Sequence, residues 1–254
     1  MNNRCQCILA LIFTIMLFSC RQEPKVEVIK QWFDEDSTML KKKYLVVIIG
    51  QDTFLNGMSN EYFQNGNIKQ SVNYDHGLMV GQANSYFKNG LIMTKQSYSK
   101  GLLHGLSKDF YENGNVKLEV TYENGIMNGD MIEYSFSGHK SKSIILVSGL
   151  KNGPSLIFDS LGNIYTRLSY KNDVLDGEMT SFYPDGKLSL RRYYKNGLKE
   201  GNAQTFYSNG ELKLFFNYSK NKEEGKGLLY DSLGKVIEER LYQHGEMKSY
   251  KQFK

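Results

Sequence analysis

A glycine that recurs every 24 residues constrains this chain more than any other feature. The spacing holds over eight copies without an insertion, at Gly57, Gly81, Gly105, Gly129, Gly153, Gly177, Gly201 and Gly225. Five residues after each glycine stands an aromatic residue: Tyr62, Tyr86, Phe110, Tyr134, Phe158, Phe182, Phe206 and Tyr230. A strict period of this length indicates one structural unit stacked on copies of itself.

Each unit contains two runs of strand-forming residues. A second glycine follows the first by nine residues, at Gly66, Gly90, Gly114, Gly138, Gly162, Gly186, Gly210 and Gly234. A tyrosine usually stands 17 residues after the first glycine, with Leu146 in its place in the fourth unit. Two apolar-aromatic runs that each end in a turn signal indicate a β-hairpin. The sequence therefore predicts an all-β fold, an elongated single antiparallel sheet of eight tandem 24-residue β-hairpins over residues 57–248.

The first turn of each hairpin can be assigned from its side chains. Asn-Gly pairs such as Asn113-Gly114 are typical of a two-residue type I′ loop, which needs φ > 0 at both residues. The fifth and eighth units have Leu161 and Leu233 at the first of these positions, and a leucine resists positive φ. We therefore predict a three-residue loop, in which a type I turn is followed by a glycine in the left-handed region.

This loop fixes which side chains share a face. Tyr62 is expected to face Ile68 across the hairpin, and Tyr74 to face Leu78 across the next turn. Since alternate residues of a strand share a face, the large residues of all units are expected on one side of the sheet. A bulge at the opening glycine would shift this parity locally. Because the fourth unit departs most from the pattern, any distortion is expected there.

A second aromatic column stands one residue beyond the first, on the opposite face by alternation. Its members are Phe63, Phe87, Tyr111, Tyr183 and Tyr207. Two interpretations are open for these side chains. They pack beside the hairpin turns, or they form an exposed strip that binds a protein or a glycan.

The first 20 residues differ from the rest of the chain. An apolar run over residues 8–18 follows Arg4, and its length of about 11 residues is too short for a membrane-spanning helix. It ends in Leu17-Phe18-Ser19-Cys20, which resembles the lipobox of bacterial lipoproteins, although Phe18 is larger than the usual residue before Ser19. The resemblance implies a lipoprotein signal peptide over residues 1–19 and acylation of Cys20. Membrane lipid is then a partner of the acyl chains, and the protein lies in the cell envelope, periplasmic or surface-exposed.

The remaining segments complete the expected organisation. Residues 20–56 are expected to form a lipid-anchored tether and an N-terminal capping segment, and residues 249–254 a C-terminal tail. All three cysteines (Cys5, Cys7, Cys20) lie at or before the lipobox, so the rest of the chain can form no disulfide and no thiolate metal site. The net charge of +5 comes from interleaved acidic and basic residues, which argues against nucleic acid as a partner.

The units resemble the MORN repeat, in the variant form found in bacterial antitoxin-like repeat proteins. The likeness rests on Phe110-Tyr111-Glu112-Asn113-Gly114 and on Lys195-Asn196-Gly197-Leu198-Lys199-Glu200-Gly201. It covers about residues 57–248. The resemblance implies a repeat sheet that serves as a protein-interaction or structural module.

Signals for catalysis are weak. His76, His104, His139 and His244 stand in or next to turns, and no hydrolase, metalloprotease or phosphate-binding motif is present. We therefore expect no enzyme, no cofactor and no metal. The leading hypothesis is a membrane-anchored cell-envelope lipoprotein whose sheet binds an unidentified protein or has a structural role. The alternatives are a glycan-binding surface lipoprotein that uses the aromatic strip, and an antitoxin-like protein that neutralises a partner toxin.

Overall fold

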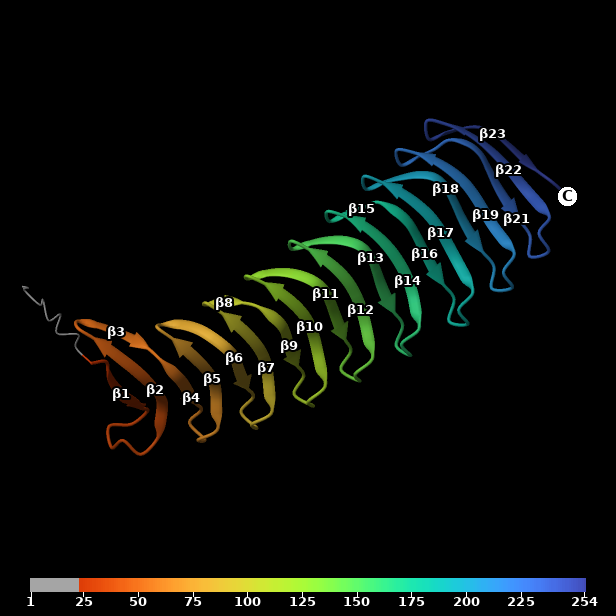
Figure 1. Cartoon of the computed structure of the whole chain (residues 1–254). Coiled ribbons are helices and arrows are strands. Elements are labelled where there is room, and N and C mark those ends of the chain that lie inside the picture. Colours follow the sequence, from red (N-terminus) through yellow and green to blue (C-terminus); the bar gives the residue numbers. More distant parts are fainter. Residues whose placement is uncertain (1–22) are drawn as a thin grey trace, which may run out of the picture.

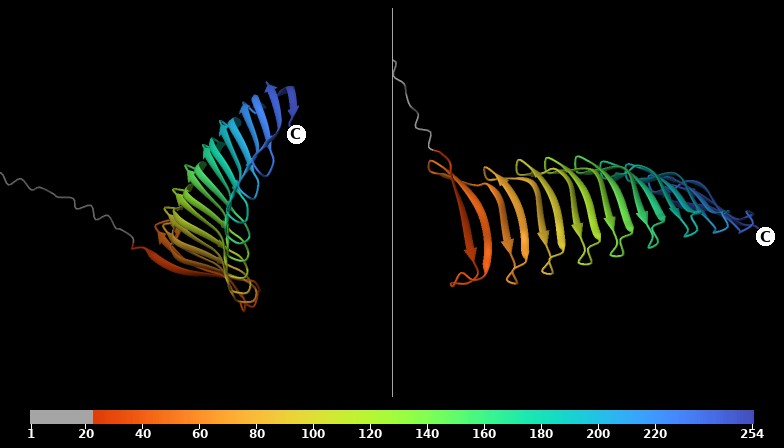
Figure 2. Two further views of the ribbon diagram at one scale, coloured as in Figure 1. Left: turned by 90° about the vertical axis from the view of Figure 1, so that its right-hand side faces the viewer. Right: turned by 60° about the horizontal axis from the view of Figure 1, so that its bottom comes forward.

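The computed structural model describes residues 23–254, and this part of the chain consists of strands and turns without a helix (Figure 1). Every strand pairs antiparallel with its neighbours, and the views in Figure 2 show one open, arched layer. The N-terminal end comprises β1 (Lys25–Trp32), β2 (Leu40–Ile49) and β3 (Asp52–Leu55). The predicted fold class, a single antiparallel sheet of β-hairpin repeats, is confirmed.

The hairpins follow one another in chain order. The first four units contain β4 (Gly57–Tyr62), β5 (Ile68–Asp75), β6 (Leu78–Tyr86), β7 (Ile92–Ser99), β8 (Leu102–Leu103), β9 (Gly105–Phe110), β10 (Val116–Glu123), β11 (Ile126–Tyr134) and β12 (Lys140–Val147). The last four contain β13 (Leu150–Phe158), β14 (Ile164–Lys171), β15 (Val174–Leu175), β16 (Gly177–Phe182), β17 (Leu188–Lys195), β18 (Leu198–Phe206), β19 (Leu212–Ser219), β20 (Lys222–Glu223), β21 (Gly225–Tyr230) and β22 (Val236–Gln243). A last strand, β23 (Glu246–Gln252), pairs with β22.

The first turn of each hairpin is the predicted three-residue loop. The N–H of Gly66 donates to the carbonyl of Phe63 at 3.0 Å, and the N–H of Phe63 donates to the carbonyl of Asn67 at 2.8 Å. Gly66 has a φ of +83°, whereas Asn65 is not in the positive-φ region. Because only the glycine needs positive φ, Leu161 and Leu233 fit the same loop.

The second turn is a two-residue type I′ loop, which the sequence did not reveal. His76 and Gly77 have φ values of 46° and 81°, and Asp75 pairs with Leu78. Tyr74 therefore faces Met79, and the expected Tyr74–Leu78 pair is wrong by one residue. Glycine is replaced in this turn only by Asp173 and Asn221, two residue types that tolerate the left-handed region.

Two bulges in each unit decide which face a side chain occupies. Gly81 has positive φ and lies in a bulge, because Tyr74 faces Met79 while Val72 faces Ala83. Beside the three-residue loop a second shift occurs, where Tyr62 faces Ile68 but Glu61 faces Gln70. The extra residue there, Lys69, breaks the alternation between Ile68 and Gln70.

The large residues consequently occupy two faces, so the expectation of a single face is wrong. We call the face that carries Val72 and Tyr74 the inner face, and the face that carries Tyr62 the outer face. The hydroxyl of Tyr134, which is equivalent to Tyr62, donates to Glu119 on β10 at 3.0 Å. Glu119 adjoins Val120 in the strand and therefore points away from it. Successive copies of each column still share one face.

The core is a row of side chains along the middle of the inner face. Within residues 57–254 the buried residues are Ser59, Val72, Ala83, Ser107, Val120, Ile144, Leu146, Ser155, Thr166, Ala203 and Gly227, all of them on this face. Small residues alternate with large ones, as in the consecutive pairs Ser107–Val120 and Ile144–Ser155.

The fourth unit is not distorted, contrary to expectation. Its strands β11 and β12 keep the register of the other hairpins. Leu146, which replaces the tyrosine, is buried with Val120 and Ile144 in an aliphatic cluster. Ile144, at 2% exposure, is the most deeply buried large side chain of the described residues. The aliphatic side chain fills the position of the missing ring without a shift of the backbone.

Further strands lie at both ends of the sheet, beyond the hairpins of the eight units. β1 begins at Lys25 and pairs with β2, so the segment expected to tether and cap the array contributes two full strands. The expected C-terminal tail belongs mostly to the edge strand β23. The expected signal peptide and Cys20 lie outside the described residues. Within residues 23–254 no helix has the length and apolarity that crossing a membrane requires.

Candidate binding surface

The predicted aromatic strip lies on the inner face, beside the three-residue loops. Its three tyrosines are tied to the next unit. The hydroxyl of Tyr111 donates to the carbonyl of Tyr134 at 2.8 Å, Tyr183 to Phe206 at 2.6 Å, and Tyr207 to Tyr230 at 2.8 Å. A half-buried hydroxyl that is already bonded to backbone is poorly available to a ligand, so these three rings primarily join neighbouring hairpins.

The gaps in the strip have a structural explanation. Where the ring is replaced by Asp159, its carboxylate accepts the backbone N–H groups of Leu161 and Asn163 at 2.9 and 2.8 Å. Asp231 accepts the equivalent two groups in the eighth unit. These bonds, led by the one from Asn163, hold the pKa of Asp159 below its usual value. The aspartates therefore close their own turns instead of packing on the next one.

The two phenylalanines of the strip differ from its tyrosines. Phe63 and Phe87 line an open hollow of about 670 Å³, which lies mainly on the first two units. The rest of its wall comes from Lys69, Gln70, Ser85, Tyr86, Lys88, Met93 and Glu112. A second hollow of about 540 Å³ adjoins it, shares Phe63, Lys69 and Lys88, and extends to Phe33 and Lys41. We call the two together the Phe63–Phe87 hollow.

Two polar groups at the rim of this hollow are already bonded to other parts of the sheet. The Lys69 ammonium lies 2.7 Å from the Glu61 carboxylate. The carbonyl of Lys88 accepts both Asn65 Nδ2 and Asn67 Nδ2 at 2.9 Å, which fastens the first loop to the second. Met93 is 38% exposed. The hollow therefore offers aromatic and thioether surface on a scaffold whose loops are held by side-chain hydrogen bonds.

The outer-face aromatics form a structural column. Tyr134 bonds to Glu119, and the Arg167 guanidinium lies 5.4 Å from the centre of the Phe182 ring. Burial and the hydrogen bond to Glu119 raise the pKa of Tyr134. The hydrogen bond from Lys108 lowers the pKa of Glu119. These rings are half-buried by their own polar neighbours.

The inner-face tyrosines form another column, which flanks the buried row. Burial and the proximity of Tyr74 raise the pKa of Tyr98. Burial, followed by the charges of Asp109 and Tyr98, raises the pKa of Tyr122. Lysine ammonium groups lie 5.1 and 5.0 Å from the ring centres of Tyr170 and Tyr218. This column extends the apolar lining of the inner face along the array.

An aliphatic ridge follows the type I′ turns, and sequence reasoning missed it. It consists of Leu78, Leu102, Ile126, Leu150, Val174 and Leu198, which are 39–53% exposed. The side chains of Leu78, Leu102, Ile126 and Val174 lie against the turn glycine of the next unit. These residues recur every 24 positions directly after the closing turn signal, so the ridge could have been predicted from the repeat.

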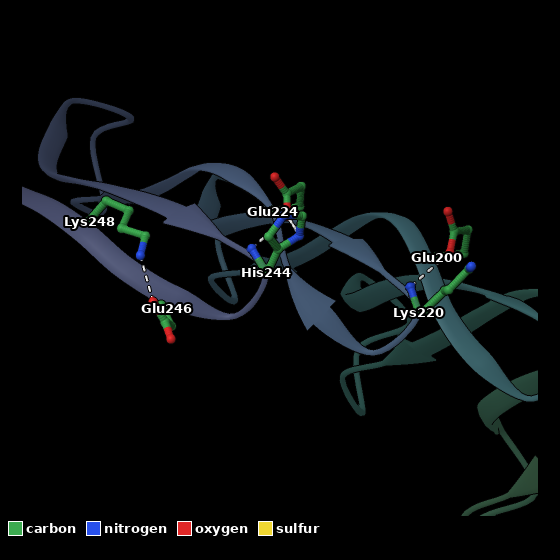
Figure 3. A network of polar contacts seen from close by, with 6 residues as sticks. All are labelled: Glu200, Lys220, Glu224, His244, Glu246 and Lys248. Carbon is green, nitrogen blue, oxygen red and sulfur yellow. Dashed lines mark hydrogen bonds and ion pairs between the residues drawn. The ribbon is translucent and has the colours of Figure 1, made fainter.

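Carboxylates at these turns hold backbone N–H groups of the following turn. Figure 3 shows Glu200 against Lys220 and Glu224 against His244 at successive turns. Each carboxylate accepts the backbone N–H of the later residue, at 2.9 and 2.8 Å. His139 instead contacts the carbonyl of Ser160 at 3.0 Å. In the part of the chain that the structure describes, no three His, Cys, Asp or Glu side chains gather as metal ligands would.

Comparisons with known proteins address the repeat unit. The model of the MORN repeat variant matches residues 55–76, 103–124 and 175–196. These segments lie in the same phase of the first, third and sixth units. No curated protein matches the sequence.

Similarity to solved structures is low throughout. The Tc holotoxin pore of Photorhabdus luminescens is 15% identical, with a TM-score of 0.21, over 85% of this chain and 12% of that one. The TcdB2-TccC3-Cdc42 complex is 12% identical, with a TM-score of 0.22, over 89% and 15%. A porin-like protein from Bacteroides uniformis is 9% identical, with a TM-score of 0.20, over 90% and 95%. The chain thus spans less than a sixth of the first two structures it matches.

MORN repeats are typical of protein-interaction and structural modules. Three of the eight units match the MORN repeat variant, and the remaining five repeat the same 24-residue hairpin in an unbroken array.

Proposed function

We propose that the protein is a cell-envelope lipoprotein, anchored through acylated Cys20, whose repeat sheet binds another protein at the Phe63–Phe87 hollow. The anchor is supported by the lipobox-like Leu17-Phe18-Ser19-Cys20 that ends the apolar run. The protein-binding role is supported by the match of three units to the MORN repeat variant. The choice of site rests on the hollow, because it is lined by two half-buried rings of the strip that carry no hydroxyl to bond to the next unit.

The position of β1 sets where the hollow lies relative to the anchor. Lys25, the first residue of β1, is the fifth residue after Cys20. Such a segment reaches at most about 18 Å, because an extended chain spans roughly 3.3–3.6 Å per residue. The hollow is mainly on the first two units, so it lies at the same end of the array as the proposed anchor, and the later units extend away from the hollow (Figure 1).

The chemistry of the hollow favours a protein over a glycan. Phe63, Phe87 and Met93 provide no hydrogen-bonding group beyond the weak thioether sulfur, whereas sugar rings present many hydroxyls. Aromatic residues and methionine are enriched at protein interfaces. An apolar side chain of a partner, placed between the two rings, would bury surface without leaving polar groups unpaired. Neutralisation of a toxin would be one form of such binding.

The anchor is tested by Cys20→Ser in the full-length protein. We expect this variant to lose acyl labelling and to be released from membranes or to remain as an unprocessed precursor. Cys7→Ser is the matched control, since it removes a cysteine before the lipobox and should label normally. Normal acyl labelling of the Cys20→Ser variant, measured with a clickable palmitate analogue, would show that the anchor assignment is wrong.

The binding site is tested by photo-crosslinking in cells. A benzoylphenylalanine placed at Phe87 is expected to give a protease-sensitive adduct of discrete mass, and Phe63→Ala is expected to abolish it. The same probe at Tyr165, an exposed aromatic on the fifth unit, is the control and should give no such adduct. Equal adducts at both positions, or a protease-resistant glycan adduct, would contradict protein binding at the hollow.

A further inference from the structure

The strand β1 is an open edge of the sheet. It pairs with β2 on one side, and no described strand pairs with its other side (Figure 1). The pairing runs from Lys25 to Gln31 without a register shift. Such a regular edge presents a row of backbone donors and acceptors that can pair with another strand.

The two edges of the sheet differ in regularity. β23 contains a bulge where Tyr242 meets Met247, whereas the pairing of β1 is unbroken from Lys25 to Gln31. Each edge strand carries three charged residues, so the bulge and not the charge distinguishes the edges, and a bulge hinders the pairing of an edge. β1 exposes Val26 and Val28, at 62% and 52%, on one face.

These two valines extend an apolar patch at the edge. Val26 faces Val47 and Val28 faces Leu45 on β2. Val47 is buried, and Leu45 is half-buried. The patch therefore ends abruptly at β1 with two exposed side chains, which is the arrangement expected where a further strand is added.

The direction of the strands indicates which strand can pair with the open edge of β1. Because consecutive rows of the sheet alternate in direction, β1 and β23 run the same way. Joining β23 of one copy to β1 of the next would require a parallel pair, in a sheet that is antiparallel throughout. Two β1 strands, by contrast, pair antiparallel about a two-fold axis perpendicular to the sheet.

The two-fold axis also restricts the register. It places the same face of both copies on the same side of the joint sheet, so two residues that pair across the axis must differ in sequence number by an even number. Centring the pair on Glu27 or Lys30 would place two like charges opposite each other. The regular stretch of seven residues, from Lys25 to Gln31, has Val28 at its centre.

We propose that two copies of this chain associate through β1, with Val28 of one copy opposite Val28 of the other. Val26 then faces Lys30 of the second copy, Glu27 faces Ile29, and Lys25 faces Gln31. No like charges oppose each other in this register. The apolar patch becomes continuous across the axis, and the two arrays form one longer antiparallel sheet.

Site-specific cross-linking tests the register. The full chain, with Cys5, Cys7 and Cys20 changed to Ser, is given one new cysteine on β1 and treated with a short bismaleimide in detergent. Val28→Cys is expected to yield a covalent dimer. Val26→Cys is the matched control, because the two copies of this residue lie about 13 Å apart along the strands. Cross-linking of Val26→Cys that equals or exceeds that of Val28→Cys overturns the proposal.

Mass in solution tests the edge itself. The unmodified full chain is expected to have the mass of a dimer by sedimentation in detergent, after subtraction of the bound detergent. Val26→Lys with Val28→Lys is expected to halve that mass while its melting temperature at low concentration is unchanged. Ser249→Lys on β23 should leave the dimer intact. A monomeric parent chain, or a dimer lost only in the β23 variant, refutes pairing through β1.

Discussion

At the scale of single residues, backbone conformation decides which positions tolerate substitution. Gly162 has a φ of +88°, and an added Cβ would meet no atom within 4 Å. Any cost of a side chain there is therefore backbone strain and not a clash. Leu161, the residue before it, has ordinary backbone conformation and is 75% exposed.

This contrast gives a matched pair of substitutions. Gly162→Val is expected to lower the free energy of unfolding by about 1–3 kcal/mol, the usual cost of a non-glycine residue held at positive φ. Leu161→Val is expected to change it by less than about 0.5 kcal/mol, as for most exposed positions. Urea unfolding of both variants checks the pair. Equal loss of stability in the two would contradict the loop assignment.

The same residues show which turns could be predicted from the sequence. Leu161 and Leu233 excluded one turn type, so the three-residue loop could be predicted. The type I′ turn at His76 and Gly77 offered no such exclusion, because histidine, asparagine and lysine all occupy its first position. The hollow could not be predicted either, since Phe63 and Tyr111 occupy equivalent positions and only contacts with the next unit distinguish them.

At the scale of strands, the inner face depends on alternating sizes across neighbouring rows. Gly227 stands where other units have serine, alanine or methionine, and Phe216 lies over it from β19. A Cβ on Gly227 would lie 2.3 Å from a ring carbon of Phe216. The ring also packs edge-on against Tyr242, with centres 5.6 Å apart. A large ring and a missing side chain are therefore complementary at this point of the row.

A double-mutant cycle measures this complementarity. Gly227→Val is expected to destabilise by about 1–3 kcal/mol, as overpacking of a filled site does. In a Phe216→Ala background the same change should cost less, with a coupling of about 0.5–3 kcal/mol. Chemical unfolding of the four proteins provides the numbers. Strictly additive effects would show that the two positions do not share the space.

At the scale of strands, the sequence did not show on which face of the sheet each side chain lies. A strand predicted to run evenly from Ile68 to Tyr74 would place Tyr62 and Tyr74 on one face. The extra residue Lys69 puts Tyr62 and Tyr74 on opposite faces, and a lysine is not a residue type that indicates a bulge. The opening glycines did signal the other bulge, since all eight have positive φ. The two-strand unit and the pairing order of the repeats were therefore predictable, and the distribution of aromatics between the faces was not.

At the scale of the whole molecule, contacts reach only the adjacent unit. Asn113 Nδ2 donates to Phe136, and the backbone N–H of Ser148 donates to Asn128 Oδ1, 23 and 20 residues apart in the chain. The ring hydroxyls of the strip join units over the same distance. Stability should then be a sum of similar nearest-neighbour terms, with no segment that all the others require.

Removing one whole unit tests this view of the molecule. Deletion of residues 81–104 joins Val80 to Gly105 and preserves the 24-residue phase, so every remaining side chain keeps its face. We expect this variant to retain β-sheet circular dichroism and cooperative unfolding, with the sheet shorter by about 9–10 Å, the width of two strands. Deletion of residues 82–104 removes one residue fewer and places Gly81 directly before Gly105. The shift of one position reverses the faces at the junction, so this variant should unfold at a clearly lower temperature. Equal melting temperatures for the two deletions would mean that the phase of the repeat does not hold the array together.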